Sequence, residues 1–107
     1  MAINQYEIVL VNLDPTVGSE IKKMRPCVII SPNEMNMYLN TVVIAPMTSQ
    51  SKKYPTRVSV KHNSKIGWIV VDQIRTIDKR RIIKILDNLT KKEIEKLKST
   101  LKETFID

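Results

Sequence analysis

The stretch TVVIAPMTSQSKKYPTRVSV (residues 41–60) contains two runs rich in β-branched residues with a polar segment between them. Residues 41–45 read Thr-Val-Val-Ile-Ala, which predicts a buried strand. Residues 46–55 are polar and carry two prolines, which predicts a loop. Residues 56–60 alternate polar and apolar side chains, so one face of the second strand should contact water. Two strands joined by a short polar loop favour an antiparallel sheet.

Similar apolar runs lie on both sides of this stretch. They predict further strands at residues 8–11, at 27–30 after Pro26, and at 66–71, with residues 74–77 and 82–86 extending this set. The connections are short and polar. This spacing favours a small antiparallel barrel or sandwich over β-α-β units.

The C-terminal part of the sequence changes to a helical period. Thr90 and Glu93 have the spacing of a capping box, with the threonine at the N-cap. Apolar residues then recur at helical spacing, at Ile94, Leu97, Leu101 and Phe105. We predict one amphipathic helix of about 15 residues that packs its apolar stripe on the barrel and turns its lysines to solvent.

Length and composition limit the class of protein. The chain has 107 residues, which predicts one domain spanning residues 1–107. One cysteine and one histidine exclude a structural zinc finger, so we predict no metal and no cofactor. No apolar run approaches the ~20 residues of a membrane span. The N-terminus lacks the charged segment of a signal peptide, so we expect a cytoplasmic protein without a membrane partner.

The charge is large and unevenly distributed. The formal net charge is +7 at pH 7. Residues 1–50 carry three Lys or Arg against four Asp or Glu, whereas residues 51–107 carry fifteen against seven. Such a field attracts phosphate polymers or acidic protein tails. Simple solubility is the other reading of the same charge.

Three polar segments contain residues that could take part in binding or catalysis. The first covers residues 14–26, DPTVGSEIKKMRP. It joins the first two predicted strands and is long for a hairpin loop, as functional loops often are. Arg25 precedes Pro26, which favours an extended conformation at the strand entrance. An arginine held there is suited to bind an anion. A surface arginine beside a turn proline is the alternative.

The other two polar segments are residues 46–55 and 72–81. The first offers hydroxyl, amide and ammonium groups that can bind phosphate oxygens, unless it is simply a solvated loop. In the second, Asp72, Gln73 and Arg75 follow a buried run and could contact base edges, while residues 79–81 form a basic patch that faces phosphate or solvent.

For several single residues, the sequence predicts a structural or solvent-exposed role and not a functional one. Trp68 lies in an apolar strand, so we predict a core side chain and not a base-stacking platform. His62 is predicted as a solvated loop histidine and Cys27 as a small core residue. The sequence contains no Gly-rich nucleotide loop and no tight carboxylate cluster of the kind found in two-metal nucleases.

Three segments together resemble the MazF/PemK family of bacterial toxin endoribonucleases. They are NLDPTVGSEIKKMRPCVIISP (12–32), VIAPMTSQSKKYPTRV (43–58) and DQIRTIDKRR (72–81), and their order and spacing match over essentially the whole chain. The resemblance implies a mainly β fold, a small SH3-like β-barrel with a C-terminal helix, that works as a homodimer.

The same resemblance implies an activity and a partner. The activity is sequence-selective, metal-independent cleavage of single-stranded RNA, mainly mRNA, and it requires no cofactor. Such chemistry uses the RNA 2′-hydroxyl as the nucleophile and needs a base, an acid and stabilisation of the phosphorane charge. The partner is a cognate antitoxin with an acidic, disordered tail.

The resemblance also assigns residues. Arg25 and Thr48 occupy the catalytic positions, with Arg25 stabilising the phosphorane and Thr48 holding a phosphate oxygen, and Glu20 is the candidate base. The residues expected to contact RNA are Ser19, Lys22, Lys23, Ser49, Gln50, Lys52, Lys53, Asp72, Gln73 and Arg75.

Two departures from the family favour the Arg25 and Thr48 mechanism. Better-studied plasmid members place a basic residue just before the Asp-Gln pair, where this chain has Val70 and Val71, and they use a histidine near the first loop, which is absent here. Two other functions remain open. A gyrase-poisoning toxin of the same fold would lack the first two loops, and a non-catalytic RNA-binding module would need no pairing of Arg25 with Thr48.

Overall fold

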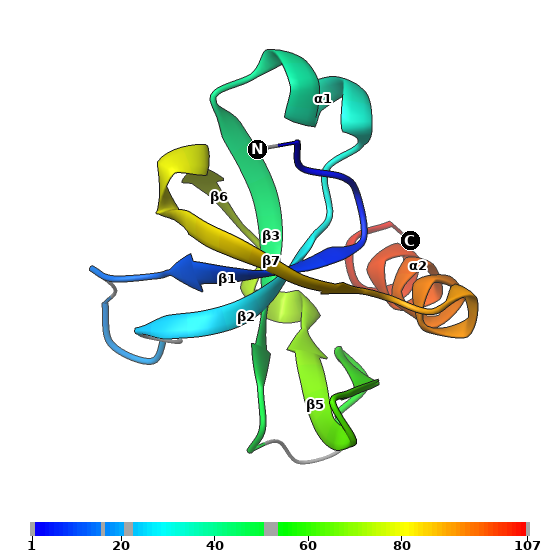
Figure 1. The fold of residues 1–107 in the computed structure, drawn as a ribbon. Coiled ribbons are helices and arrows are strands. Elements are labelled where there is room, and N and C mark those ends of the chain that lie inside the picture. Colours follow the sequence, from blue (N-terminus) through cyan, green and yellow to red (C-terminus); the bar gives the residue numbers. More distant parts are fainter. Residues whose placement is uncertain (1, 16, 21–22, 51–53, 107) are drawn as a thin grey trace.

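The computed structural model describes residues 2–15, 17–20, 23–50 and 54–106. Seven strands, two helices and two short 3-10 turns follow one another along the chain (Figure 1). In order they are β1 (Glu7–Asn12), β2 (Met24–Ile29), α1 (Asn33–Tyr38), β3 (Thr41–Thr48), β4 (Arg57–His62), β5 (Lys65–Val70), η1 (Val71–Gln73), β6 (Arg75–Asp78), η2 (Lys79–Arg81), β7 (Ile82–Asn88) and α2 (Lys91–Phe105).

The strands form one curled antiparallel sheet. Its order is β4-β5-β3-β2-β1-β7, and β6 pairs with β3 beside this path. The two ends of the order are linked by one polar contact, between His62 on β4 and Asp87 on β7 at 2.8 Å. The Lys61 amide, also on β4, donates to Glu93 on α2. The predicted fold class, a small β-barrel that is mainly β with a C-terminal helix, is confirmed, and the sheet has the form of a curled half-barrel.

Two apolar clusters fill the fold, one on each face of β1 and β2. Val9, Val11 and Cys27 belong to the cluster inside the curled sheet, whereas Ile8 and Val28 belong to the one under α2. Both faces of these strands are therefore covered. That is why their sequence is a continuous apolar run and not an alternating one.

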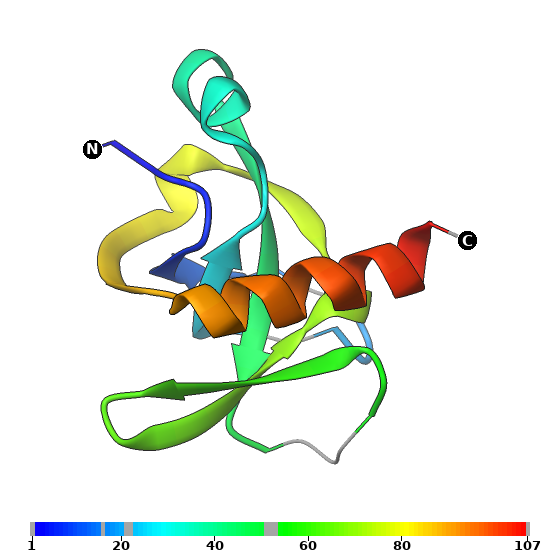
Figure 2. The ribbon, with the colours of Figure 1, turned by 90° about the vertical axis from the view of Figure 1, so that its right-hand side faces the viewer.

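Helix α2 begins with the predicted capping box. The Thr90 hydroxyl accepts from the Glu93 amide, and the Glu93 carboxylate accepts from the Thr90 amide. The helix lies across one face of the sheet (Figure 2), where Leu97 is fully buried and Leu101 packs beside it. Phe105 departs from the predicted stripe and is exposed, because it lies at the helix end beyond the sheet.

The structure corrects three local predictions. Strand β3 was expected to end at residue 45 but continues to Thr48, since at this point it leaves β2 and pairs with β5. Pro46 is the last β3 residue paired with β2, so its missing N–H falls where that ladder ends. Trp68 is only half-buried, opposite Thr48 and Ser59. Helix α1 was not predicted.

Cys27 gives a prediction about thiol reactivity. Its side chain is fully buried, and this burial raises the pKa of Cys27 to about 12, although the nearby positive charge of Arg75 acts in the opposite direction. The thiolate is the reactive form, so only about one thiol in ten thousand should be ionised at pH 8. We expect negligible alkylation of the native protein by iodoacetamide over hours at pH 8, and rapid alkylation after unfolding in denaturant, measured by mass spectrometry. Fast modification of the native protein would contradict this burial.

Candidate functional site

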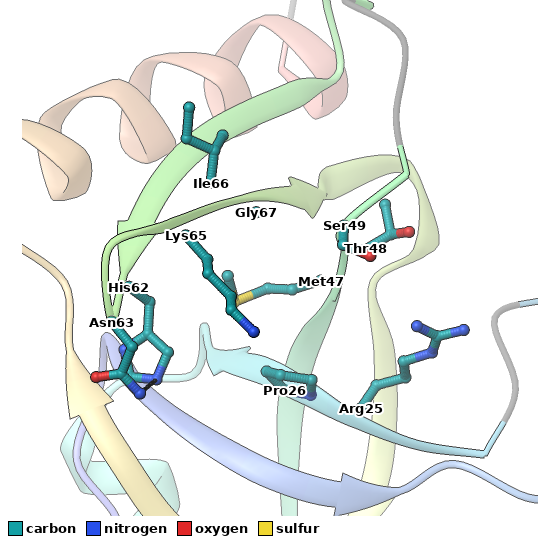
Figure 3. A pocket seen from close by; sticks show the side chains of 10 residues that line it. All are labelled: Arg25, Pro26, Met47, Thr48, Ser49, His62, Asn63, Lys65, Ile66 and Gly67. Atoms are coloured by element: carbon teal, nitrogen blue, oxygen red, sulfur yellow. Dashed lines mark hydrogen bonds between the residues drawn. The ribbon is translucent and has the colours of Figure 1, made fainter.

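A pocket opens where strand β3 changes partners. The ladder between β2 and β3 stops at Cys27 and Pro46, and β3 then pairs with β5 through Met47 and Thr48. Strand β2 therefore forms one wall and the β4–β5 hairpin the other. The pocket has a volume of about 340 Å³ and is lined by Arg25, Pro26, Met47, Thr48, Ser49, His62, Asn63, Lys65, Ile66 and Gly67 (Figure 3).

Arg25 lies at the β2 wall of this pocket. It is a half-buried strand residue opposite Val11 of β1, so the extended conformation predicted from Pro26 is confirmed. If the β2–β3 register continued beyond Cys27, Arg25 would stand opposite Thr48. Figure 3 shows the guanidinium group pointing toward the end of the pocket that holds Thr48 and Ser49. The structure thus brings Arg25 and Thr48, distant in sequence, to one site.

Thr48 is the last residue of β3, and its hydroxyl contacts the backbone of the following loop. Its Oγ1 lies 3.2 Å from the Gln50 amide nitrogen, which donates to it, and 3.4 Å from the Gln50 carbonyl. Ser49 lines the pocket and is exposed, as is Gln50. The predicted RNA contacts Lys52 and Lys53 lie outside the described residues.

The first polar loop holds itself together by local hydrogen bonds. The Glu20 carboxylate accepts from the Val17 amide, and Asp14 accepts from the Lys23 amide at 3.0 Å. Glu20, Ser19 and Lys23 are exposed, and none of them lines the pocket. Lys22 lies outside the described residues. The structure therefore does not bring the candidate base, Glu20, to Arg25 and Thr48.

In the third polar segment (residues 72–81), Asp72 and Arg75 form hydrogen bonds with other parts of the fold. Asp72 accepts from the Thr56 hydroxyl at 2.9 Å and from Arg57 Nε at 3.2 Å, so its carboxylate anchors the start of β4. Arg75 is half-buried, and its guanidinium donates to the Leu13 carbonyl at 3.2 Å, which holds the first loop near β6. Gln73, also half-buried, ends the η1 turn. None of these three residues lines the pocket.

His62 is a pocket residue that sequence reasoning missed. It was expected in a solvated loop, but strand β4 extends to it, and its side chain is 19% exposed against Asp87. Asn63 and Ser64 both have positive φ, as in the tight two-residue turns of hairpins. The Asn-Ser pair between two strand-like runs was the available signal. The His62 contact and the backbone bond of Asn88 together hold the pKa of Asp87 below its usual range, with the backbone bond the larger cause.

The described part of the chain contains neither a metal-binding cluster nor a membrane-spanning helix. Within it, no group of three or more His, Cys, Asp or Glu side chains could hold a metal ion. No helix there is both long and apolar enough to span a bilayer.

A family profile and a curated relative agree on the same family. The profile of the family described as "PemK-like, MazF-like toxin of type II toxin-antitoxin system" matches residues 4–105. A curated relative from Staphylococcus saprophyticus, named Endoribonuclease MazF, is 33% identical over 101 residues, which are 89% of this chain and 84% of the relative.

Solved structures share the fold over almost the whole chain. MazF from Deinococcus radiodurans superposes with a TM-score of 0.87 at 24% identity, covering 97% of this chain and 96% of that one. A mycobacterial endoribonuclease in complex with its cognate antitoxin gives a TM-score of 0.81 at 21% identity, covering 95% and 93%. The curled sheet and its C-terminal helix are therefore those of these toxins.

Proposed function

Because the chain belongs to the family of PemK-like, MazF-like toxins of type II toxin–antitoxin systems, we propose that it is an endoribonuclease. It cleaves single-stranded RNA, chiefly mRNA, in the cytoplasm, and the one domain of residues 1–107 carries this activity. The observation that supports the proposal most strongly is that Arg25 and Thr48 line one pocket.

The reaction uses a nucleophile that the substrate carries. The 2′-oxygen attacks the adjacent phosphorus, the 5′-oxygen leaves, and a 2′,3′-cyclic phosphate and a 5′-hydroxyl remain. Negative charge grows on the phosphoryl oxygens in the transition state, and a fixed guanidinium stabilises it. Arg25, held on strand β2, supplies that group.

Thr48 contributes a hydrogen bond to the same phosphate. Its oxygen accepts from the Gln50 amide at 3.2 Å, which fixes the hydroxyl at the end of β3. The same hydroxyl donates a long hydrogen bond to the Gln50 carbonyl at 3.4 Å. When RNA binds, this proton turns from the carbonyl to a non-bridging phosphate oxygen. Glu20 stays a prediction as the base, since its carboxylate holds the Val17 amide and does not line the pocket.

The other residues that we propose to contact RNA are polar or charged. Ser19, Lys23, Ser49 and Gln50 are exposed and able to contact the strand. Lys22, Lys52 and Lys53 add positive charge, and Asp72, Gln73 and Arg75 shape the neighbouring surface. The reaction itself needs no metal or cofactor.

The proposed partners are a second copy of the chain and an antitoxin. The structure of a mycobacterial endoribonuclease has been solved in complex with its cognate antitoxin, and that of Deinococcus radiodurans MazF has been solved with MazE. A net charge of +7 favours an acidic, disordered segment that folds as it binds. A symmetric homodimer would place two sets of loops along one basic groove.

One experiment separates the proposed enzyme from its alternatives. The purified protein is incubated with a long RNA, and cut sites are mapped by primer extension. Cleavage at defined sites supports the endoribonuclease. Binding without cleavage would indicate an RNA-binding module, and inhibition of DNA gyrase without either would indicate the other toxin class.

Competition with the antitoxin is a further prediction. The acidic tail and RNA should bind the same basic groove, so a tail peptide should displace labelled, uncleavable RNA from the dimer. RNA affinity should also fall with salt, with a logarithmic slope of about 0.7 for each phosphate contacted. Fluorescence anisotropy measures both effects. If saturating peptide leaves the RNA bound, inhibition acts from another surface.

A further inference from the structure

The pocket beside Arg25 has an apolar middle that the proposed chemistry does not use. Pro26 and Met47 form its floor, and Met47 is only 5% exposed. Gly67 lies on the facing strand β5 and contributes no side chain. A Cβ at this position would meet Met47 Cε at 3.2 Å and the Thr48 carbonyl at 3.8 Å. The glycine therefore keeps open a space that almost any other residue would fill.

The strand register explains why this space lies inside the fold. Gly67 pairs with Val60, and two residues further on Ile69 pairs with Val58, with both valines and Ile69 buried in the core under α2. Gly67 thus continues the inward-facing row of the hairpin beyond the point where the core ends. The pocket is an extension of that core, open to solvent at one side.

Polar groups stand at both ends of the apolar middle. Arg25, Thr48 and Ser49 lie at one end and His62 and Asn63 at the other, and Lys65 extends from strand β5 between them (Figure 3). His62 is held in place by Asp87 at 2.8 Å, and the Lys65 side chain reaches toward the interior of the pocket. Positive groups along the rim of an apolar space match a nucleotide, whose flat base projects from a sugar that carries a phosphate on each side.

We propose that this pocket holds the base of the nucleotide next to the cleaved phosphate, with Lys65 binding the other phosphate of that nucleotide, across its sugar from the cleaved one. The inference rests on the proposed function. A base presents two apolar faces, which pack on Pro26 and on the Met47 thioether across from Gly67. The volume of about 340 Å³ is within the range of about 300–1,000 Å³ for small-ligand sites. An acidic side chain of the antitoxin fits less well, because it would lose hydration against the apolar floor.

The decisive experiment combines a filled pocket with RNA that lacks one base at a time. The ligand is a short RNA that contains a mapped cut site, made uncleavable by one 2′-deoxy sugar, and an abasic residue is placed at each position in turn. For the wild-type dimer, one position beside the cut should lower affinity about tenfold when its base is removed. Gly67→Val should lower the affinity for intact RNA by a similar factor. In that variant, the abasic residue at this position should cause less than a twofold further loss.

Three further variants test the role of Lys65 and guard against misfolding. Lys65→Ala should weaken binding and reduce the salt slope by about 0.7. Lys61→Ala removes the same charge from the same hairpin outside the pocket lining and should change the slope less. Gly67→Ala adds only a Cβ, which meets the flexible end of Met47, so we expect this variant to fold even where Gly67→Val does not. In Gly67→Ala, removal of the base should lower RNA affinity less than in the wild type but more than in Gly67→Val.

The outcomes separate this inference from the proposed function. If the wild type cleaves the parent RNA but Gly67→Val binds intact RNA normally, or remains sensitive to the abasic residue, the base pocket is wrong and the endoribonuclease stands. If Gly67→Val weakens only the antitoxin tail peptide, the pocket belongs to the antitoxin and the inference is overturned. If the wild type neither binds nor cleaves RNA, both proposals fail.

Discussion

Replacing Arg25 by alanine should lower the rate of RNA cleavage by about 100-fold or more while the protein stays folded. The guanidinium is the positive group that we place beside the phosphorane, and losing such a group costs about this much in other enzymes. Arg25 is a half-buried residue at the end of β2, outside both apolar clusters, so its removal leaves the core intact. Single-turnover cleavage of a labelled oligomer measures the rate, and circular dichroism checks the fold.

Three further variants make the Arg25 result specific. Arg25→Lys keeps the charge but loses the two-pronged guanidinium, so it should recover only part of the rate. Thr48→Ala should lose less than Arg25→Ala, because it removes one neutral hydrogen bond. Arg80→Ala is the matched control, since it removes a positive charge from a side chain that is 90% exposed and bonded to Asp78. A folded Arg25→Ala protein that cleaves at the wild-type rate would remove Arg25 from the mechanism.

The strands and the helix were predictable because their signals are local. The Thr90 and Glu93 spacing defines a capping box whatever the helix later contacts, and the structure has that box. The apolar runs of β1 and β2 are long because both of their faces are covered. Residues within one element carry this information, so no knowledge of strand pairing was needed.

The construction of the pocket was not predictable in the same way. It depends on β3 leaving β2 at Pro46 and pairing with β5, a choice of partner that no run of residues states. Pro46 read locally as the end of a strand, and His62 as part of a turn. The contact between His62 and Asp87 joins residues 25 apart in sequence, at opposite ends of the strand order.

The sequence likewise predicted some residues that line the candidate pocket and could not distinguish others from structural residues. Arg25 and Thr48 were named from the resemblance, and the fold brings them to one pocket. Asp72 and Arg75 were named with them, yet their side chains contact Arg57 and the Leu13 carbonyl. A polar residue after a buried strand has the same sequence signal whether it faces a ligand or supports a loop. Only the three-dimensional contacts distinguish the two roles.

A single 2′-deoxy sugar on the 5′ side of the cut should stop cleavage almost completely. In the proposed reaction, the 2′-oxygen is the nucleophile and already lies next to the phosphorus. A nucleophile held in this way is worth many orders of magnitude over one from solution, so we expect a loss of roughly 1,000-fold or more. The deoxy RNA should still bind, because one hydroxyl is a small part of the contact. Anisotropy measures binding, and gel analysis measures cleavage.

The products and the effect of a chelator test the same mechanism independently. Wild-type cleavage should leave a 2′,3′-cyclic phosphate and a 5′-hydroxyl, identified by mass spectrometry, and the rate should be unchanged in EDTA. If the deoxy RNA were cut normally, water would be the nucleophile, and the enzyme would need a group to activate it. Arg25 cannot serve as that group, because a guanidinium stays protonated. Cleavage of the deoxy RNA would therefore require a different set of catalytic residues, and not merely an adjustment of the roles of Arg25 and Thr48.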